Sequence, residues 1–149
     1  MGLPHDAYLI DISKNYQTSP EFPNVTPTTK ISAIIAPLRP ECRPLAQFES
    51  GANLICFAET PEPFLPANRR HDVLRWLVVD MGGVGRILGQ VGAIRVFAGE
   101  ENEDPCPKDR YRAAVERLPK VLGDAVTGKD RIVGEWSIAD IAICPWLRR

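Results

Sequence analysis

Short apolar runs rich in β-branched residues mark the first third of this chain of 149 residues. They cover residues 7–12, 30–36 and 45–48, and prolines and turn-forming residues separate them. Runs of this length and composition predict strands. The segment 37–44 holds three prolines, which cannot continue a strand, so we expect a loop there.

From residue 50 onward the period changes, because apolar residues recur every three or four positions, as on one face of a helix. Helices are expected from Ser50, after Asn68 and over residues 108–122. Pro119 lies inside the third of these and is expected to kink or shorten it. The last helix starts with a capping box, Ser137-Ile138-Ala139-Asp140, in which two side chains satisfy backbone N–H groups.

Strands followed only by helices predict an α+β domain joined to an all-helical domain. Residues 61–66 hold three prolines, which exclude a helix there. We therefore expect a first domain over residues 1–60, a linker over residues 61–66 and a helical domain over residues 67–149.

Composition and charge exclude several classes of function. The 18 basic and 19 acidic residues give a net charge of -1, which lacks the basic footprint of a nucleic-acid-binding protein. No apolar run approaches the ~20 residues that cross a bilayer. The four cysteines form no Cys-x-x-Cys pair and only two histidines are present, so no zinc pattern can be assembled. We expect a cytoplasmic protein with reduced thiols and no metal, membrane or nucleic-acid partner.

The glycines in Met81-Gly82-Gly83-Val84-Gly85 follow an apolar run, as they do in dinucleotide-binding sites. Such a site needs a strand before a G-x-G-x-x-G spacing. Here residues 72–81 keep a helical period and the glycine spacing differs. We therefore expect the glycines to lie inside a helix, where they permit close packing and a bend.

The run Phe48-Glu49-Ser50-Gly51-Ala52 places a carboxylate and a hydroxyl at the junction of an expected strand and helix. The first N–H groups of a helix lack intrahelical partners and carry partial positive charge, which favours an anion. Ser50 is suited to hold a carboxylate there and Glu49 to hold an ammonium, so the pair fits the zwitterionic end of an amino acid. Ordinary N-capping by Ser50 explains the same pattern.

These motifs, in their order along nearly the whole chain, resemble the glutathione transferase family. The glutathione-binding half of the family is matched by Gln17, Pro20-Glu21-Phe22, Pro27, Lys30–Ile34 and Phe48–Ala52. Its helical domain is matched by Arg75-Trp76-Leu77, Met81–Gly85, Leu88-Gly89-Gln90, Asp109-Arg110-Tyr111 and Gly134–Ile141. The pattern is most similar to the bacterial Nu-class subgroup related to the yeast prion protein Ure2, whose members bind glutathione and reduce disulfides.

The resemblance implies a thioredoxin-like domain followed by a helical bundle, with glutathione as co-substrate. Within the site it implies that Glu49 and Ser50 hold the γ-glutamyl group of glutathione. It also implies that the backbone of Ile31 pairs with the cysteinyl unit.

The remaining carried-over residues concern the far end of glutathione and the assembly. Gln17 and Lys30 are expected beside the glycyl end. Arg110 is expected to reach the glutathione of the partner subunit in a homodimer. Ser137 and Asp140 are expected to be structural.

The chain also departs from the family pattern. The family's first strand and first helix, and the closing helices of its bundle, have no counterpart in this sequence, so we expect an incomplete thioredoxin-like domain and a truncated helical domain. The missing segment carries the side chain that favours the glutathione thiolate, the reactive species, so no catalytic residue is expected here.

Ser32 stands at the family's cis-proline. Because a cis bond without proline costs ~2.5–4 kcal/mol, we expect a trans bond before Ser32.

Three functions remain open at this point. The family's reaction is addition of glutathione thiolate to electrophiles or glutathione-dependent reduction of disulfides. The alternatives are a non-catalytic glutathione-binding or dimerisation module, and the product of a degraded gene without activity. Turnover would indicate the family's reaction. Binding or dimerisation without turnover would indicate the non-catalytic module. The absence of turnover, binding and dimerisation would indicate the degraded gene product.

Overall fold

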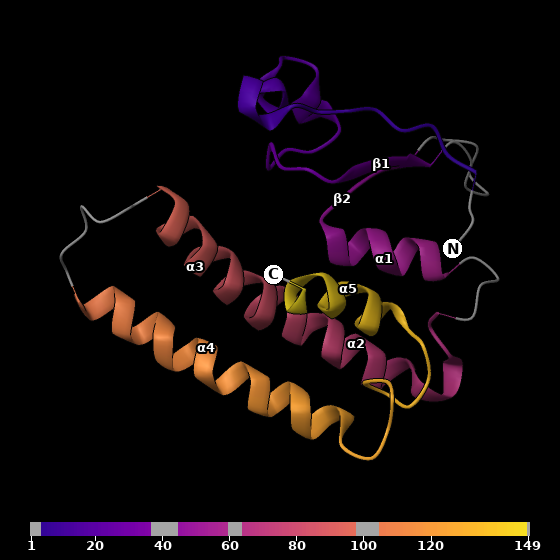
Figure 1. Cartoon of the computed structure of the whole chain (residues 1–149). Coiled ribbons are helices and arrows are strands. Elements are labelled where there is room, and N and C mark those ends of the chain that lie inside the picture. Colours follow the sequence, from indigo (N-terminus) through magenta and orange to yellow (C-terminus); the bar gives the residue numbers. More distant parts are fainter. Residues whose placement is uncertain (1–3, 37–44, 60–63, 98–104, 149) are drawn as a thin grey trace. The chain divides into compact units, whose positions relative to one another are not determined.

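The computed structural model describes residues 4–36, 45–59, 64–97 and 105–148 (Figure 1), with side chains described except at 93–97 and 105–110. The chain divides into two compact units, Met1–Glu62 and Pro63–Arg149. In the described residues the first unit holds a two-stranded sheet and one α-helix, and the second holds helices. This arrangement confirms the expected α+β class. Residues 61–63 of the expected linker lie outside the described residues.

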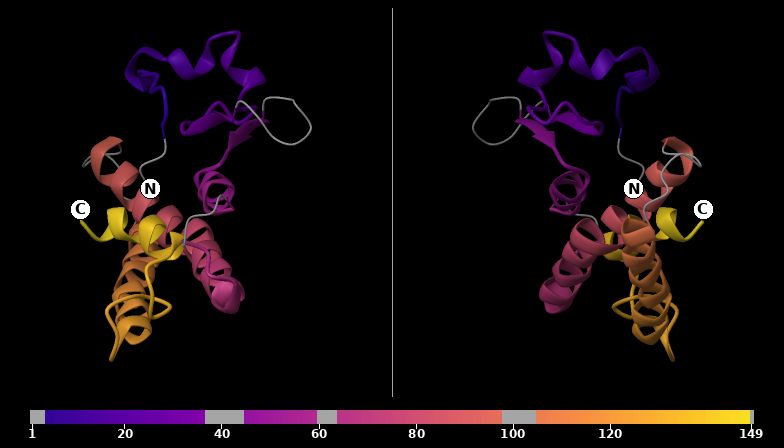
Figure 2. Two further views of the ribbon diagram at one scale, coloured as in Figure 1. Left: turned by 90° about the vertical axis from the view of Figure 1, so that its right-hand side faces the viewer. Right: turned by 90° about the vertical axis from the view of Figure 1, so that its left-hand side faces the viewer.

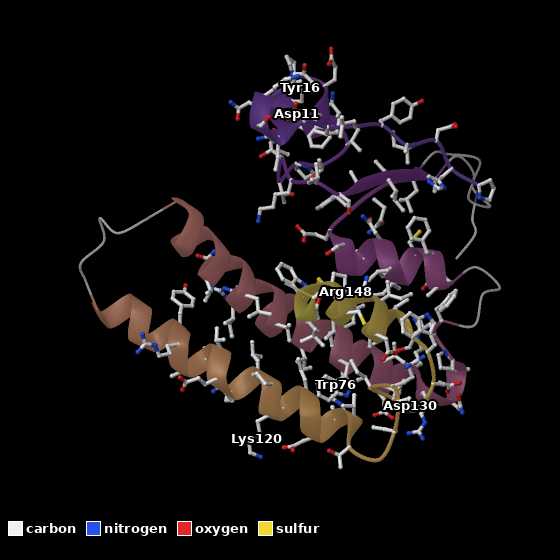
Figure 3. All side chains as sticks on the ribbon, in the orientation of Figure 1. Asp11, Tyr16, Trp76, Lys120, Asp130 and Arg148 are labelled. Atoms are coloured by element: carbon white, nitrogen blue, oxygen red, sulfur yellow. The ribbon has the colours of Figure 1, made fainter. Side chains whose placement is uncertain are left out.

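The first unit begins with turns rather than a strand, so the strand expected over residues 7–12 is wrong. Residues 4–11 have no regular structure, and three short 3-10 turns follow at Ile12–Lys14, Tyr16–Thr18 and Phe22–Asn24. Figure 3 labels Asp11 and Tyr16 in this segment. Asp11 Oδ1 accepts from Ser13 N at 3.0 Å and from Ser13 Oγ at 2.6 Å, which favours a turn over an extended chain.

The exposure of the apolar residues in this segment explains the error. Tyr8 and Leu9 are 85% and 89% exposed, so their side chains have no sheet face to bury against. Strand propensity reflects packing on a half-buried sheet surface rather than an intrinsic backbone preference. An apolar run without such a surface has no reason to become a strand.

The sheet of the first unit consists of β1 (Ala33–Ala36) and β2 (Leu45–Phe48), paired antiparallel with Ala33 opposite Phe48. The strand expected over 45–48 is confirmed, and the one expected over 30–36 is shorter than predicted. The expected loop over 37–44 lies outside the described residues. Helix α1 (Ser50–Ala58) follows β2 after one residue and packs on both strands, which confirms the helix expected from Ser50.

The second unit contains α2 (Arg70–Val79), a π-helical turn (Asp80–Val84), α3 (Gly85–Phe97), α4 (Pro105–Val126) and α5 (Ile138–Leu147). Helix α5 packs against α2, the π-helical turn and α3, and α4 packs along α3; Figure 2 shows these helices from two further sides. The buried apolar residues of this unit include Val73, Leu77, Val84, Leu118, Leu122, Ile138 and Ile143. None of the helices in the described part of the chain is long and apolar enough to cross a membrane.

Two details of these helices correct the sequence analysis. The residue that caps α2 is Arg69 rather than Asn68, because a short 3-10 turn at Ala67–Arg69 precedes the helix. Helix α4 continues past Pro119 to Val126. Leu118 and Leu122 flank this proline and are both buried, so their packing compensates for the backbone hydrogen bond that proline removes.

The glycine-rich segment lies in continuous helical backbone between α2 and α3, as expected. No strand precedes the glycines, so they do not form a dinucleotide-binding turn. At Gly85 an added Cβ would lie 3.2 Å from Cε2 and Cζ2 of Trp146 and 3.3 Å from the Asp80 carbonyl oxygen. Gly85 therefore permits the close approach of α5 to the start of α3.

We expect Gly85→Ala to lower the free energy of unfolding by about 1 kcal/mol, because the new methyl group meets a packed ring and a backbone oxygen. Gly82→Ala is the matched control, since nothing lies within 4 Å of its added Cβ. The control should gain roughly 0.5–1 kcal/mol from the higher helix propensity of alanine. Urea unfolding of both variants measures the difference. Equal gains in the two variants would show that Gly85 is not a packing position.

The capping box at the start of α5 is present, as expected from the sequence. Asp140 Oδ2 accepts from Ser137 N at 3.0 Å and from Ser137 Oγ at 2.9 Å. Its second oxygen, Oδ1, accepts from Ile132 N at 3.1 Å. Ile138 N donates to Phe64 O at 3.0 Å, so the start of α5 is also bonded to the segment before α2.

Candidate functional site

The turn between β2 and α1 presents the two residues that the sequence singled out. Glu49 is the N-cap residue of α1 and has φ 69° and ψ 123°, a positive φ that is uncommon outside glycine. Such backbone conformations are concentrated at ligand-binding and catalytic sites. Both Glu49 and Ser50 are exposed, and the first N–H groups of α1 give this end of the helix partial positive charge.

The antiparallel register brings a second segment to the same end of the sheet. Ala33 pairs with Phe48, so Ile31 and Ser32, which precede β1, lie at the end of the strand pair where Glu49 and Ser50 follow β2. Ile31 is 53% exposed. The structure therefore brings Ile31 to the same end of the strand pair as Glu49 and Ser50, although Ile31 lies 18 positions before Glu49 in the sequence.

The peptide bond between Ile31 and Ser32 is cis, so the expected trans bond is wrong. The expectation considered only the intrinsic cost of such a bond. It could not include the tertiary contact of Ser32, whose carbonyl oxygen accepts from Asn53 Nδ2 at 3.2 Å and whose hydroxyl lies 3.4 Å from the same nitrogen.

The remaining expected site residues are less closely tied to this turn. Lys30 is exposed and adjoins Ile31. Gln17 lies in the second 3-10 turn, and its Oε1 is buried without a hydrogen-bond partner among the described residues. That turn is separate from the strand ends where Ile31, Glu49 and Ser50 lie. Arg110 belongs to α4 in the second unit, and its side chain lies outside the described residues.

Sequence analysis missed Asn53, which lies four residues after Glu49 in α1 and is 5% exposed. Its backbone N–H donates to Glu49 O at 2.9 Å, and its side chain donates to Ser32. The available signal was an asparagine between Ala52 and Leu54, on the apolar side of an expected helix. Buried polar side chains are normally hydrogen-bonded, so such a residue indicates a specific tertiary contact.

No protein-family model matches the chain. Known proteins with a similar sequence and fold include several glutathione transferases. The glutathione transferase of Burkholderia graminis, solved with two glutathione molecules per subunit, is 43% identical and has a TM-score of 0.93 over 99% of this chain and 62% of its own. The glutathione transferase of Pseudomonas putida, solved with one glutathione disulfide per subunit, is 42% identical, with a TM-score of 0.93 over 99% of this chain and 65% of its own. Disulfide-bond oxidoreductase YfcG of Escherichia coli is 36% identical over 142 residues, which cover 93% of this chain and 65% of that protein.

This chain belongs to the glutathione transferase family. The resemblance seen in the sequence is thereby confirmed. Compared with the family members it matches, the chain spans about two thirds of the length or less: 65% of YfcG, and 50% of disulfide-bond oxidoreductase YghU of Escherichia coli.

Asp80 is an unusual buried group in the helical unit of this glutathione transferase homologue, and sequence analysis did not single it out. It is the first residue of the π-helical turn and is 0% exposed. Neither of its carboxylate oxygens has a hydrogen-bond partner among the described residues. Burial raises its pKa to about 6, because the charged carboxylate loses hydration. No group of three or more His, Cys, Asp or Glu residues in the described part of the chain is placed to hold a metal ion.

Proposed function

We propose that this chain binds glutathione at the end of the sheet where Ile31, Glu49 and Ser50 meet, and that the whole protein uses glutathione to reduce disulfides. The observation that carries the proposal is the antiparallel register, which places the backbone before β1 beside the N-terminus of α1. Disulfide reduction is supported by the likeness to YfcG and YghU, both named disulfide-bond oxidoreductases. The likeness to the Pseudomonas putida enzyme, solved with glutathione disulfide, supports the same subgroup.

The charges at this end of the sheet match those of glutathione. The γ-glutamyl group carries an ammonium and a carboxylate, which Glu49 and the N-terminus of α1 with Ser50 are suited to hold. Ile31 is an exposed residue, and its backbone can pair with the extended cysteinyl unit, in the manner of a peptide added to a sheet edge. Lys30 supplies a cation for the glycyl carboxylate, and we place Gln17 beside it at the glycyl end.

The proposed reaction is thiol–disulfide exchange. The thiolate of one glutathione attacks a sulfur of the substrate disulfide, and the other sulfur leaves as a thiolate that takes up a proton. A second glutathione then attacks the mixed disulfide, which releases glutathione disulfide and the second substrate thiol. In this scheme the residues of the chain bind and orient glutathione; none of the described residues is assigned a catalytic role.

We also propose a homodimer in which Arg110 reaches the glutathione of the partner subunit. A guanidinium is suited to this task, because it binds a carboxylate through two parallel hydrogen bonds. Addition of glutathione to electrophiles uses the same thiolate and is a second outcome of an activity assay. Glutathione binding without turnover of either substrate class would indicate a non-catalytic binding module.

Ser50→Ala is expected to weaken glutathione binding about tenfold, because a hydrogen bond to a charged group contributes ~1.5–3 kcal/mol. Titration calorimetry measures this loss. Glutathione, its disulfide and S-hexylglutathione should bind the unchanged chain with similar affinity, because the proposed contacts leave the sulfur unused. Ser13→Ala is the matched control, since Ser13 is an exposed serine whose hydroxyl donates to Asp11.

Two results would contradict the proposed binding mode. One is the absence of binding heat with all three ligands from a folded sample. The other is an equal affinity for glutathione in Ser50→Ala and Ser13→Ala.

A further inference from the structure

Asn53 joins the two parts of the candidate site. Its backbone N–H donates to Glu49 O at 2.9 Å, within the first turn of α1. Its side-chain Nδ2 donates to Ser32 O at 3.2 Å and lies 3.4 Å from Ser32 Oγ. One residue is therefore bonded both to the turn that precedes α1 and to the segment that precedes β1.

The geometry fixes the orientation of the Asn53 amide. A carbonyl oxygen can only accept, so the atom facing Ser32 O must be the amide nitrogen. The other amide atom, Oδ1, is buried without a hydrogen-bond partner among the described residues. With the side chain 5% exposed, water competes poorly for Nδ2, so the contact with Ser32 is worth more than a surface hydrogen bond.

Ser32 adjoins Ile31, whose backbone is proposed to pair with the cysteinyl unit of glutathione. The proposed γ-glutamyl contacts come from Glu49 and Ser50, at the start of α1. A ligand held at both places binds well only if their separation is fixed beforehand, because ordering a loose segment on binding costs free energy.

We infer that Asn53 is a positioning residue that sets the Ile31–Ser32 backbone at the correct distance from the N-terminus of α1 for glutathione. The inference rests on the proposed glutathione site and adds to it a residue that need not touch the ligand. Without the Nδ2 donor, the carbonyl of Ser32 loses its partner from α1, and the Ile31 backbone is free to move relative to Glu49 and Ser50.

Asn53→Leu tests the inference, because leucine keeps the size of the side chain and removes the two side-chain contacts with Ser32. We expect glutathione to bind about tenfold more weakly by calorimetry, as for the loss of a buried hydrogen bond. In the absence of ligand, the NMR amide signals of Ile31, Ser32 and Ala33 should shift and their hydrogen exchange should accelerate. Ala58→Gly is the control: it lowers the stability of α1 at a buried position away from Ser32, and should leave the affinity unchanged.

Asn53→Asp provides a second test, whose readout is the pH dependence of glutathione affinity. A purely structural role of Asn53 would not change this pH dependence. At pH 7 the introduced carboxylate cannot donate to Ser32 O, so binding is weak. At pH 5 a buried carboxyl is partly protonated, because burial raises its pKa, and its O–H can donate. Measured against the unchanged chain at each pH, the affinity of Asn53→Asp should recover at pH 5. This variant also decides the matter if Asn53→Leu does not fold.

The outcomes separate this inference from the proposed function. Unchanged affinity in Asn53→Leu, or unmoved amide signals at residues 31–33, would overturn the positioning role of Asn53. An affinity loss in Ala58→Gly as large as that in Asn53→Leu would also overturn it, because general destabilisation would explain both. If the unchanged chain does not bind glutathione, the proposed function fails, while the ligand-free amide signals still report on the contact between Asn53 and Ser32.

Discussion

Asp80→Asn should stabilise the helical unit by about 1–2 kcal/mol at pH 8 and destabilise it by about 1 kcal/mol at pH 4. Burial raises the pKa of Asp80 from 3.8 to about 6, so between these values the folded chain binds more protons than the unfolded chain. The free energy of unfolding therefore falls as the pH rises through this range, by about 3 kcal/mol in total. Below pH 3.8 the carboxyl is neutral in both states and the penalty is absent.

Asparagine removes this titration but leaves a neutral amide buried in the same place. That amide has no identified partner, so only part of the 3 kcal/mol is regained. Thermal or urea unfolding from pH 4 to pH 8 measures the effect, and Asp130→Asn, at an exposed position labelled in Figure 3, is the control. Parallel pH profiles for the unchanged chain and Asp80→Asn would show that Asp80 does not carry the raised pKa.

Asp140→Ala should have the opposite effect and lower the free energy of unfolding by roughly 3–5 kcal/mol. The side chain of Asp140 accepts three hydrogen bonds, two from Ser137 and one from Ile132 N, all of them buried. Alanine leaves these donors without a partner, and each buried unpaired donor costs ~1–3 kcal/mol. The start of α5 also loses its capping box, which is worth about 1 kcal/mol.

Asp124→Ala is the matched control for this second variant, because it removes an aspartate from a surface ion pair. Lys120 Nζ lies 3.1 Å from Asp124 Oδ2 across one turn of α4, and both side chains are largely exposed. Such a pair contributes ~0.3–0.5 kcal/mol. Urea unfolding compares the two variants. A loss below 1 kcal/mol in Asp140→Ala would mean that water or rearranged neighbours satisfy Ser137 and Ile132.

Several elements could be predicted from the sequence because their signals are local. Helix α1 begins at Ser50 as its period indicated, β2 covers the expected residues, and the capping box marks the start of α5. In each case the residues that determine the element are next to one another in the chain. The candidate site residues Glu49 and Ser50 could also be predicted from a local signal, because the sequence shows a strand followed directly by a helix.

The errors come from burial and side-chain contacts that the apolar pattern alone does not show. The apolar run at residues 7–12 has strand composition, but its side chains are exposed and Asp11 forms a local turn. Pro119 does not shorten α4, because the buried Leu118 and Leu122 stabilise the helix. The bond from Asn53 to Ser32 spans 21 residues, so the sequence could mark Asn53 as a polar residue on an apolar helix face but could not identify its partner.

The hydrogen bond from Ile138 N to Phe64 O has a consequence for how the helical unit folds. It joins the start of the last helix to the segment before the first, so it can form only after the chain between them has been brought into a closed loop. Closing such a loop costs entropy before any contact repays it. Docking of α5 is therefore a late step, and once docked, this helix couples the melting of α2 to its own. We therefore expect α2, α3 and α5 to lose their structure together, because α5 also packs against α2 and α3.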